Sequence, residues 1–128
     1  MPNRVKHYTK TKTFDRWLRK TELTDEVLRN AVVEMAAGLI DADLGAGVFK
    51  KRVALAGRGK RSGARTLVAS NLGDRWFFLF GFEKSERTNV SDQELKVLQI
   101  TGQTFLSWST AEISTALREG HLKEINHD

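Results

Sequence analysis

The chain has 128 residues, of which 40% are hydrophobic, and a formal net charge of +5; it can form one core but is too short for two independent domains, so we expect a single domain over residues 1–128. Cysteine is absent, which excludes disulfides, thiolate nucleophiles and thiolate metal sites. No apolar run is long enough to cross a bilayer and the N-terminus is polar and basic, so we expect a cytoplasmic protein with no membrane partner.

The N-terminal third of the sequence predicts two helices. The first is short, is capped by Thr13 and places three apolar residues on one face: Phe14, Trp17 and Leu18. Thr24 opens a longer helix, which has acidic residues in its first turn. The apolar residues of this second helix recur at steps of three and four and form a continuous stripe: Leu28, Ala31, Val32, Met35, Ala36 and Leu39.

The middle of the sequence changes to β-branched and aromatic residues and predicts three consecutive strands. Gly73 and Asp74 supply a tight turn before the last of them. Trp76–Phe82 is apolar at almost every position, so we expect a central strand whose aromatic side chains belong to the core and do not stack on bases. The three predicted strands are Val48–Leu55, Ala64–Leu72 and Arg75–Glu83.

Two capping boxes predict helices in the C-terminal third. Ser91 is followed three residues later by Glu94, and Ser109 is followed in the same way by Glu112. Gly120 is expected to end the second of these helices. Each box satisfies two backbone N–H groups at a helix start, so both helix starts are well defined by the sequence.

The order of these elements indicates the α+β class. Consecutive strands joined by short turns form an antiparallel meander, so we expect an antiparallel sheet of three to five strands with helices packed on one face. Residues 121–126 either add an edge strand or fray. The predicted architecture is therefore two N-terminal helices, this sheet and C-terminal helices.

Basic residues concentrate in two segments of the chain. Residues 1–20 carry seven Lys/Arg against one acid, and residues 47–90 carry ten against three, whereas the remaining segments are acidic. A basic balance also suits simple solubility, but cations at the ends of a rigid hairpin suit a phosphate-bearing polymer better. We therefore expect an RNA-directed protein that uses the cations around this hairpin: Arg58, Lys60, Arg61, Arg65, Lys84 and Arg87.

Common catalytic and cofactor motifs are missing from the sequence. There is no lysine-serine phosphate loop, no zinc-spaced ligand set, no Ser/His/Asp signature and no dinucleotide glycine pattern. The glycine-spaced residues 57–63 resemble a phosphate cradle only in composition. We therefore expect neither a metal nor a cofactor.

Two segments of the hairpin resemble a known family. The stretch from Gly59 to Ala69 and the stretch from Gly73 through Phe82 to Ser91 look like RelE-type toxins of bacterial toxin–antitoxin pairs, and most closely like the HigB-like branch. The resemblance implies a microbial ribonuclease fold that enters the ribosomal A site and cuts messenger RNA without metal. It also implies a neighbouring antitoxin that blocks the toxin.

The resemblance implies how the cut is made and which residues make it. The ribose 2′-OH attacks the adjacent phosphate and leaves a cyclic phosphate, which requires a proton acceptor, a cation at the phosphate and a proton donor. Arginine suits the phosphate because its planar fork stays protonated, and a lysine crowded by cations can have a lowered pKa. The expected catalytic residues are Arg65, Lys84, Arg87 and Lys51, and the expected RNA-binding residues are Lys50, Arg52, Arg58, Lys60, Arg61 and Arg75.

The identities of the general base and the general acid stay open. Relatives of this type carry a C-terminal tyrosine or histidine near the active site, but the corresponding segment here reads Arg87-Thr88-Asn89-Val90 and the only tyrosine is Tyr8. Glu83 and Glu86 are alternative bases, although they also suit ion pairs with Lys84 and Arg87. Three histidines are further candidates: His7, His121 and His127.

Three hypotheses follow from these observations. The first is a ribosome-dependent endoribonuclease whose partners are messenger RNA on the ribosome and a cognate antitoxin with a helix-turn-helix domain. The second is a non-catalytic RNA-binding relative of the same fold. The third is an interaction module that serves the antitoxin and reaches operator DNA only through it. The antitoxin is expected to present acidic and apolar residues, because it must cover the cationic surface around the hairpin or pack beside it.

Overall fold

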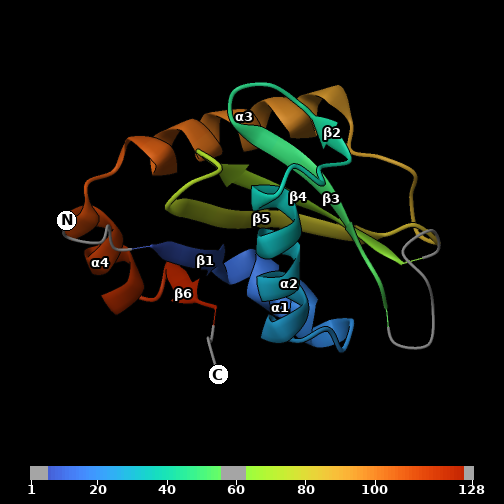
Figure 1. Ribbon diagram of the computed structural model, residues 1–128, viewed down its shortest axis with the longest axis horizontal. Helices are drawn as coiled ribbons and strands as arrows, with labels where there is room; N and C mark the ends of the chain where they lie inside the picture. Colours follow the sequence, from blue (N-terminus) through green and yellow to red (C-terminus); the bar gives the residue numbers. More distant parts are fainter. Residues whose placement is uncertain (1–5, 56–62, 126–128) are drawn as a thin grey trace.

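The computed structural model describes residues 6–55 and 63–125, and over these residues the chain forms four helices and a six-stranded sheet (Figure 1). The mixed content confirms the α+β class. The elements in chain order are β1 (His7–Thr11), α1 (Lys12–Lys20), α2 (Asp25–Ala36), β2 (Ala42–Asp43), β3 (Val48–Val53), β4 (Ala64–Ser70), β5 (Arg75–Glu83), α3 (Asp92–Ser107), α4 (Thr110–Arg118) and β6 (Leu122–Glu124).

The sheet has the strand order β2-β3-β4-β5-β1-β6. Strands β3 to β5 form the predicted antiparallel meander, and the unpredicted strand β2 adds to it antiparallel to β3. With β1, this brings the sheet to six strands, one more than the upper limit expected. The expectation of a wholly antiparallel sheet is wrong, because β1 pairs parallel with β5 and antiparallel with β6. The sequence did not reveal β1 because its residues, His-Tyr-Thr-Lys-Thr, are mostly polar, and its place is set by pairing with the apolar strand β5.

Helices cover both faces of the sheet, so the expectation that they pack on one face is also wrong (Figure 1). On one face Phe14 of α1 and Leu28 of α2 pack with Phe78 of β5. On the other face Phe77 packs with Ile113 of α4. The cause is the apolar composition of β5, which needs an apolar layer on each side.

The helix starts follow local capping chemistry. Thr11 caps α1 by accepting a hydrogen bond from Phe14 N at 3.0 Å, so the predicted cap at Thr13 is wrong by two residues. Helix α2 begins after Thr24 as predicted but ends at Ala36, which leaves Leu39 outside the helix and 60% exposed. The two capping boxes of α3 and α4 are both confirmed.

The ends of the strands are mostly close to the prediction. Strand β5 has the predicted bounds, whereas β3 and β4 are each two residues shorter at their C-terminal ends. Of the two alternatives for residues 121–126, the structure shows the edge strand, β6. Gly120 has φ of +81° just after α4, the left-handed conformation that ends a helix.

An irregularity in the β4–β5 pairing sets which aromatic residues face which helix. The register shifts between Leu67, which pairs with Phe80, and Val68, which pairs with Phe78. As a result Phe80 and Phe82 both contribute to the apolar layer under α3. Gly81 lies on the opposite face, where a Cβ atom would come within 2.4 Å of the Trp17 ring of α1.

Candidate functional site

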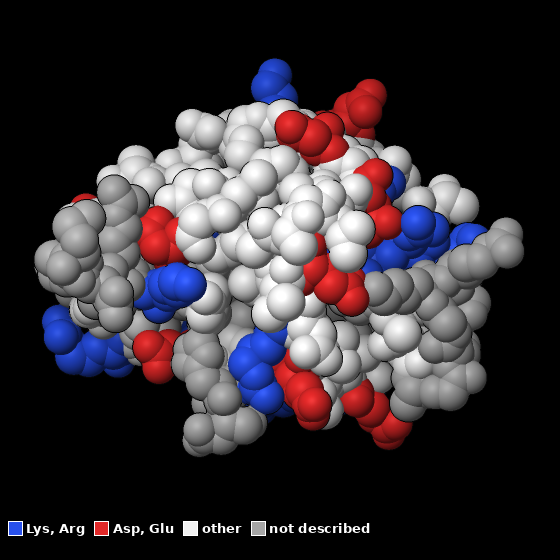
Figure 2. All heavy atoms as spheres, viewed as in Figure 1, with Lys and Arg blue, Asp and Glu red and all other residues white. Residues whose placement is uncertain are grey.

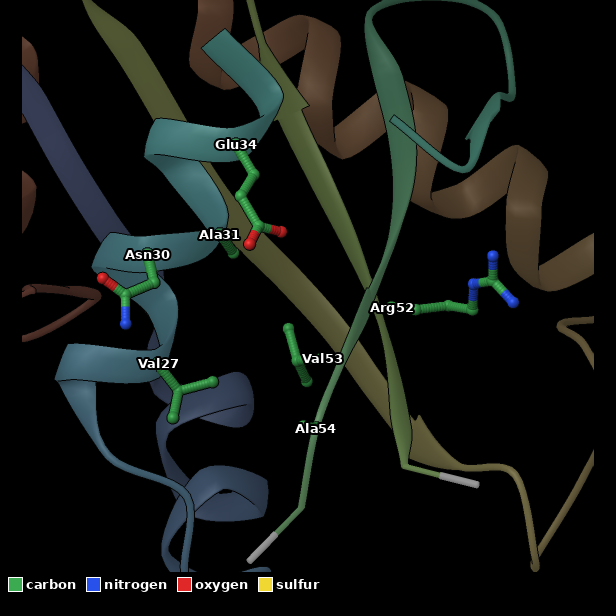
Figure 3. Close-up of a pocket in the computed structure, with 7 residues that line it drawn as sticks. All are labelled: Val27, Asn30, Ala31, Glu34, Arg52, Val53 and Ala54. Atoms are coloured by element: carbon green, nitrogen blue, oxygen red, sulfur yellow. The ribbon is translucent and has the colours of Figure 1, made fainter. Parts of the chain in front are cut away.

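Alternation along β3 separates its basic residues onto the two faces of the sheet. Val48, Lys50 and Arg52 share the face that α3 covers in part, whereas Lys51 and Val53 share the face that α2 covers. Figure 3 shows Val53 directed toward α2, while Arg52 extends away from α2 to the other side of the strand. Lys50 and Arg52 are therefore neighbours on one surface, and Lys51 belongs to the other.

Arg52 and Arg65 lie directly opposite each other in the antiparallel pairing of β3 with β4. Like charges in this position repel each other and destabilise a sheet. Burial lowers the pKa of Arg65, and the charge of Arg52 lowers it further. The charge of Asp41 offsets part of this repulsion, and a bound anion would offset more of it.

Asp41, just before β2, orients Arg52. Its carboxylate accepts hydrogen bonds from Arg52 N and Arg52 Nε, each at 2.7 Å. Burial acts to raise the pKa of Asp41, but these hydrogen bonds and the nearby positive charges outweigh it, and the pKa is lowered below the usual 3.8. The Asp41 carboxylate thus stays ionised and fixes the direction of the Arg52 side chain.

Arg87, in the segment after β5, is held by three groups. Its guanidinium carbon lies 5.5 Å from the centroid of the Phe80 ring and 5.9 Å from that of Phe82, which are cation–π distances. Its Nη1 donates to Glu94 Oε1 at 2.7 Å. Because Phe82 pairs with Arg65 across β4 and β5, Arg87 lies on the same face as Arg52 and Arg65.

We call Lys50, Arg52, Arg65 and Arg87 the basic face. Figure 2 shows one group of Lys and Arg side chains at the right of the view, over the half of the sheet away from α4, with acidic side chains beside it, and further groups at the lower left and lower centre. This half of the sheet holds the C-terminal ends of β3 and β5 and the start of β4. Cations at this fixed spacing suit the phosphates of a nucleic-acid strand.

Lys84 and the glutamates near it lie at the same end of the sheet. Lys84 is exposed, and its backbone N–H donates to the Gly63 carbonyl at 3.2 Å. Glu83 pairs with Ala64, which belongs to the apolar layer of α1 and α2, so Glu83 is on the face opposite the basic face. Glu86 is exposed in the turn after β5.

The expectation that Lys51 is surrounded by cations is wrong. Its side chain is 5% exposed under α2, where Nζ lies 2.8 Å from Glu34 Oε1 and donates to the Leu39 carbonyl at 2.9 Å. The neighbours of the ammonium group are therefore a carboxylate and a carbonyl. Strand alternation is the physical reason, because residues 50 and 51 must point to opposite faces.

Arg75 and two of the candidate histidines lie away from the basic face. Arg75 Nη1 donates to the Trp108 carbonyl at 2.7 Å, which ties β5 to the junction of α3 and α4. His7 pairs with Arg75 and is buried, and burial together with the charge of Arg75 lowers its pKa. His121 follows α4 and is exposed. The structure does not bring these three residues to the basic face.

Four expected residues lie outside the part of the chain that the structure describes: Arg58, Lys60, Arg61 and His127. Within residues 6–55 and 63–125, no group of three or more metal-binding side chains is placed to hold a metal ion. None of the helices over the same residues has the length and apolar character that a membrane span requires.

Two residues of the site were missed by the sequence analysis. Glu94 was recognised only as part of a capping box, although its carboxylate also binds Arg87. The hydrogen bond from Arg87 is the largest cause that lowers the pKa of Glu94 to about 2. Asp41 had no local signal, because its contact with Arg52 depends on the pairing of β2 with β3.

A family model described as the RelE toxin of the RelE / RelB toxin-antitoxin system matches residues 6–125. No curated protein matches the chain. The matched range includes all ten helices and strands that the structure describes, together with every residue of the basic face.

Proposed function

Because the chain belongs to the RelE toxin family and is the toxin of a toxin–antitoxin system, we propose that it is an endoribonuclease that cuts messenger RNA on the ribosome. The observation that carries this proposal is the register of β3 and β4, which sets Arg52 against Arg65 with Arg87 on the same face. Repulsion between these cations is relieved when a phosphate binds between them. The proposed reaction uses neither a metal nor a cofactor.

The proposed chemistry is an attack of the ribose 2′-OH on the adjacent phosphorus. The 2′-oxygen forms a bond to phosphorus and gives its proton to a base, the bond to the 5′-oxygen breaks, and the 5′-oxygen takes up a proton. Arg65 and Arg87 stabilise the charge that builds on the phosphate oxygens in the transition state. Lys84, at the same end of the sheet, is proposed to contact the same strand.

Lys50 replaces Lys51 in this proposal as the lysine that contacts the reacting ribose. It lies on the basic face two residues from the position of Arg52, whereas the Lys51 ammonium is bound to Glu34 on the opposite face. Proton transfer needs a group within hydrogen-bond distance of the reacting atom. The two described histidines lie away from the basic face, His7 at the start of β1 and His121 just before the edge strand β6, so neither is proposed as the proton donor.

The family implies a cognate antitoxin as the partner of this toxin. We propose that the antitoxin neutralises the toxin with acidic and apolar residues that cover the basic face or pack beside it. We further propose that the antitoxin carries a helix-turn-helix domain, that operator DNA is reached only through it, and that the pair acts in the cytoplasm. The HigB-like hairpin motif supports placement in that branch of the family.

Expression of the toxin alone in a bacterium tests the proposed reaction. We expect growth arrest, with cuts inside translated messages that leave cyclic phosphate ends, and relief of the arrest in the double variant Arg65→Ala/Arg87→Ala. The matched control is Arg16→Ala, which removes an exposed arginine of α1 outside the basic face. Intact messages in cells that express folded wild-type toxin would contradict the nuclease proposal.

A non-catalytic RNA-binding protein is the second candidate function. It is favoured by the position of His7 and His121, which leaves the basic face without a histidine among the described residues. The same expression experiment separates the two candidates. Growth arrest without message cleavage, lost in the double arginine variant, would favour RNA binding alone.

A further inference from the structure

A hollow next to Arg87 is not used by the proposed phosphate chemistry. It lies between β5 and the first two turns of α3 and has a volume of about 390 Å³. Pockets that bind small organic groups have volumes of roughly 300–1,000 Å³, so this hollow is at the lower end of that range. The residues that line it are Phe80, Ser91, Gln93, Glu94, Val97 and Leu98.

The inner wall of the hollow is aromatic and apolar. Phe80 is half-buried and comes from the central strand β5, so its ring is held by the core. Leu98 is also half-buried, whereas Val97 is 58% exposed at the rim. A flat apolar surface of this kind suits a planar ligand. A ring that stacks on Phe80 does so through its flat face, whatever hydrogen-bonding groups its edge carries.

The polar groups of the hollow belong to α3 and include one fixed acceptor. Glu94 Oε1 accepts hydrogen bonds from Arg87 Nη1 at 2.7 Å and from Ser91 N at 2.8 Å. A carboxylate has further acceptor positions, and Oε2 is the oxygen that it can offer to a ligand. Gln93 is exposed at the rim and supplies an amide that both donates and accepts.

The position of Arg87 connects the hollow to the basic face. The Arg87 guanidinium lies 5.5 Å from the centroid of the same Phe80 ring that lines the hollow. A phosphate bound by Arg87 therefore brings the base of its own nucleotide to the entrance of the hollow. A nucleobase explains the combination of a flat apolar wall, a fixed acceptor and an adjacent phosphate-binding cation.

We propose that the hollow between β5 and α3 binds one nucleobase of the target RNA and that the Glu94 carboxylate selects bases that carry an exocyclic amino group. Cytosine, adenine and guanine each present such an exocyclic amino group, whereas uracil has only its ring N3–H as a donor on that edge. The proposal rests on the proposed function in taking RNA as the ligand. Phe80 provides the stacking surface, and Glu94 discriminates against uracil at one position of the codon.

Cleavage of defined messages in a reconstituted translation system tests this proposal. The messages differ only in one base of the codon in the A site, and kcat/KM is measured for each base at each of the three positions. We expect wild-type toxin to cut messages with uracil at one position roughly ten-fold more slowly than messages with the other bases, the size of one hydrogen bond to a charged group. Phe80→Leu should lower the rate for all bases at this position by about five-fold or more.

The deciding variant is Glu94→Gln, because an amide both donates and accepts and so removes the discrimination against uracil. The ratio between bases is the readout, since a general loss of activity from a disturbed Arg87 cancels in it. The matched control is Glu112→Gln, which makes the same change in the second capping box, at the start of α4. An identical base profile in both variants would overturn the proposal, with thermal melting used to show that both are folded.

A binding measurement separates this proposal from the proposed function. Short 2′-O-methyl RNAs cannot be cut, so the affinity of the free protein for adenine and uracil versions is compared for wild type and Glu94→Gln. A preference for adenine that disappears in Glu94→Gln supports the base site even if wild-type toxin cuts no message. If the Glu94 and Phe80 variants weaken neutralisation by the antitoxin and leave every base profile unchanged, the hollow binds protein and the proposal is overturned.

Discussion

Lys51 and Arg52 are adjacent in the sequence, yet they lie in opposite environments. The Lys51 ammonium group is buried under α2 against Glu34, whereas the Arg52 side chain extends away from α2 on the other side of the strand (Figure 3), where Asp41 orients it. Both residues are cations on one strand and both looked like contacts to RNA in the sequence. The comparison teaches that in a basic β-strand the face decides whether a cation stabilises the fold or remains accessible to a ligand.

The same division separates the two ends of the sheet. Arg75, at the start of β5, donates to a main-chain carbonyl between α3 and α4, whereas Arg87, after the end of β5, is held over aromatic rings by an exposed carboxylate. One arginine joins secondary structure elements and the other borders a hollow. The four predictions below test this division and are ordered by the size of the expected effect.

The largest expected effect is the loss of cleavage in Arg65→Ala. Removing one group that stabilises developing negative charge lowers kcat by about 10²–10³ fold, or about 2.7–4 kcal/mol. Removing Arg65 removes its repulsion with Arg52 together with the favourable interactions that Arg65 makes in the fold, so stability is measured beside cleavage. Message cleavage by purified toxin and thermal melting measure the two effects. Wild-type cleavage by Arg65→Ala would show that this accessible arginine does not bind the reacting phosphate.

Lys51→Met should lower the free energy of unfolding by about 2 kcal/mol while leaving cleavage per folded molecule unchanged. Breaking a fully buried ion pair costs about 3–5 kcal/mol, and the cost is smaller here because the Glu34 side chain is 32% exposed. Denaturant unfolding measures the change. The matched control is Lys50→Met on the other face, which should cost less than about 0.5 kcal/mol. Equal losses of stability in the two variants would remove the distinction between the faces.

Lys50→Ala should lower kcat/KM for message cleavage by roughly ten-fold, the value of one hydrogen bond involving a charged group. The physical reason is that Lys50 lies on the basic face beside Arg52 and Arg65, where the ribose of the target is proposed to lie. Cleavage of a defined message on stalled ribosomes measures it. If Lys51→Ala, corrected for its folded fraction, reduced cleavage more than Lys50→Ala, the assignment of the two lysines would be reversed.

The smallest expected effect is the acid dependence of the Asp41 contribution. The pKa of Asp41 is lower in the folded protein than its usual value, so its stabilisation is fully present above about pH 4 and is lost as the pH falls through the folded pKa. Asp41→Asn should therefore be less stable than wild type at pH 7 by about 1 kcal/mol or less, and the difference should shrink in acid.

Urea unfolding across this pH range measures the Asp41 effect. The matched control is Glu86→Gln, which neutralises an exposed acid in the turn after β5. A difference between wild type and Asp41→Asn that stays constant from pH 7 to pH 3 would show that the Arg52 contact contributes nothing to stability.

Local signals in the sequence predicted much of the fold. The apolar stripe predicted α2, the two S-x-x-E boxes predicted the starts of α3 and α4, and the aromatic run predicted that β5 is a buried central strand. Each of these signals acts between residues that are close in the chain. Strand β1 could not be found in this way, because its residues are mostly polar and its stabilising partners lie near residues 75 and 122.

The candidate site was predicted in composition but not in arrangement. Arg65 and Arg87, chosen from the family motif, lie on one face, as a shared phosphate site requires. Lys51 and Arg75 were chosen for their charge, but each is bound to another part of the fold. A basic residue looks the same in a sequence whether its charge faces solvent or a buried carboxylate.

The sequence alone determined the periodicities, the helix starts, the excess of basic residues around the β4–β5 hairpin and the family, because these depend on composition and on short spacings. The tertiary structure decided which cations share a surface. Side chains on a strand alternate between faces, and a shift of one residue exchanges the two sets. The register of β3 against β4 therefore places Lys50 and Arg52 on one face of the sheet, and Lys51 on the other face, where its ammonium group binds the Glu34 carboxylate of α2.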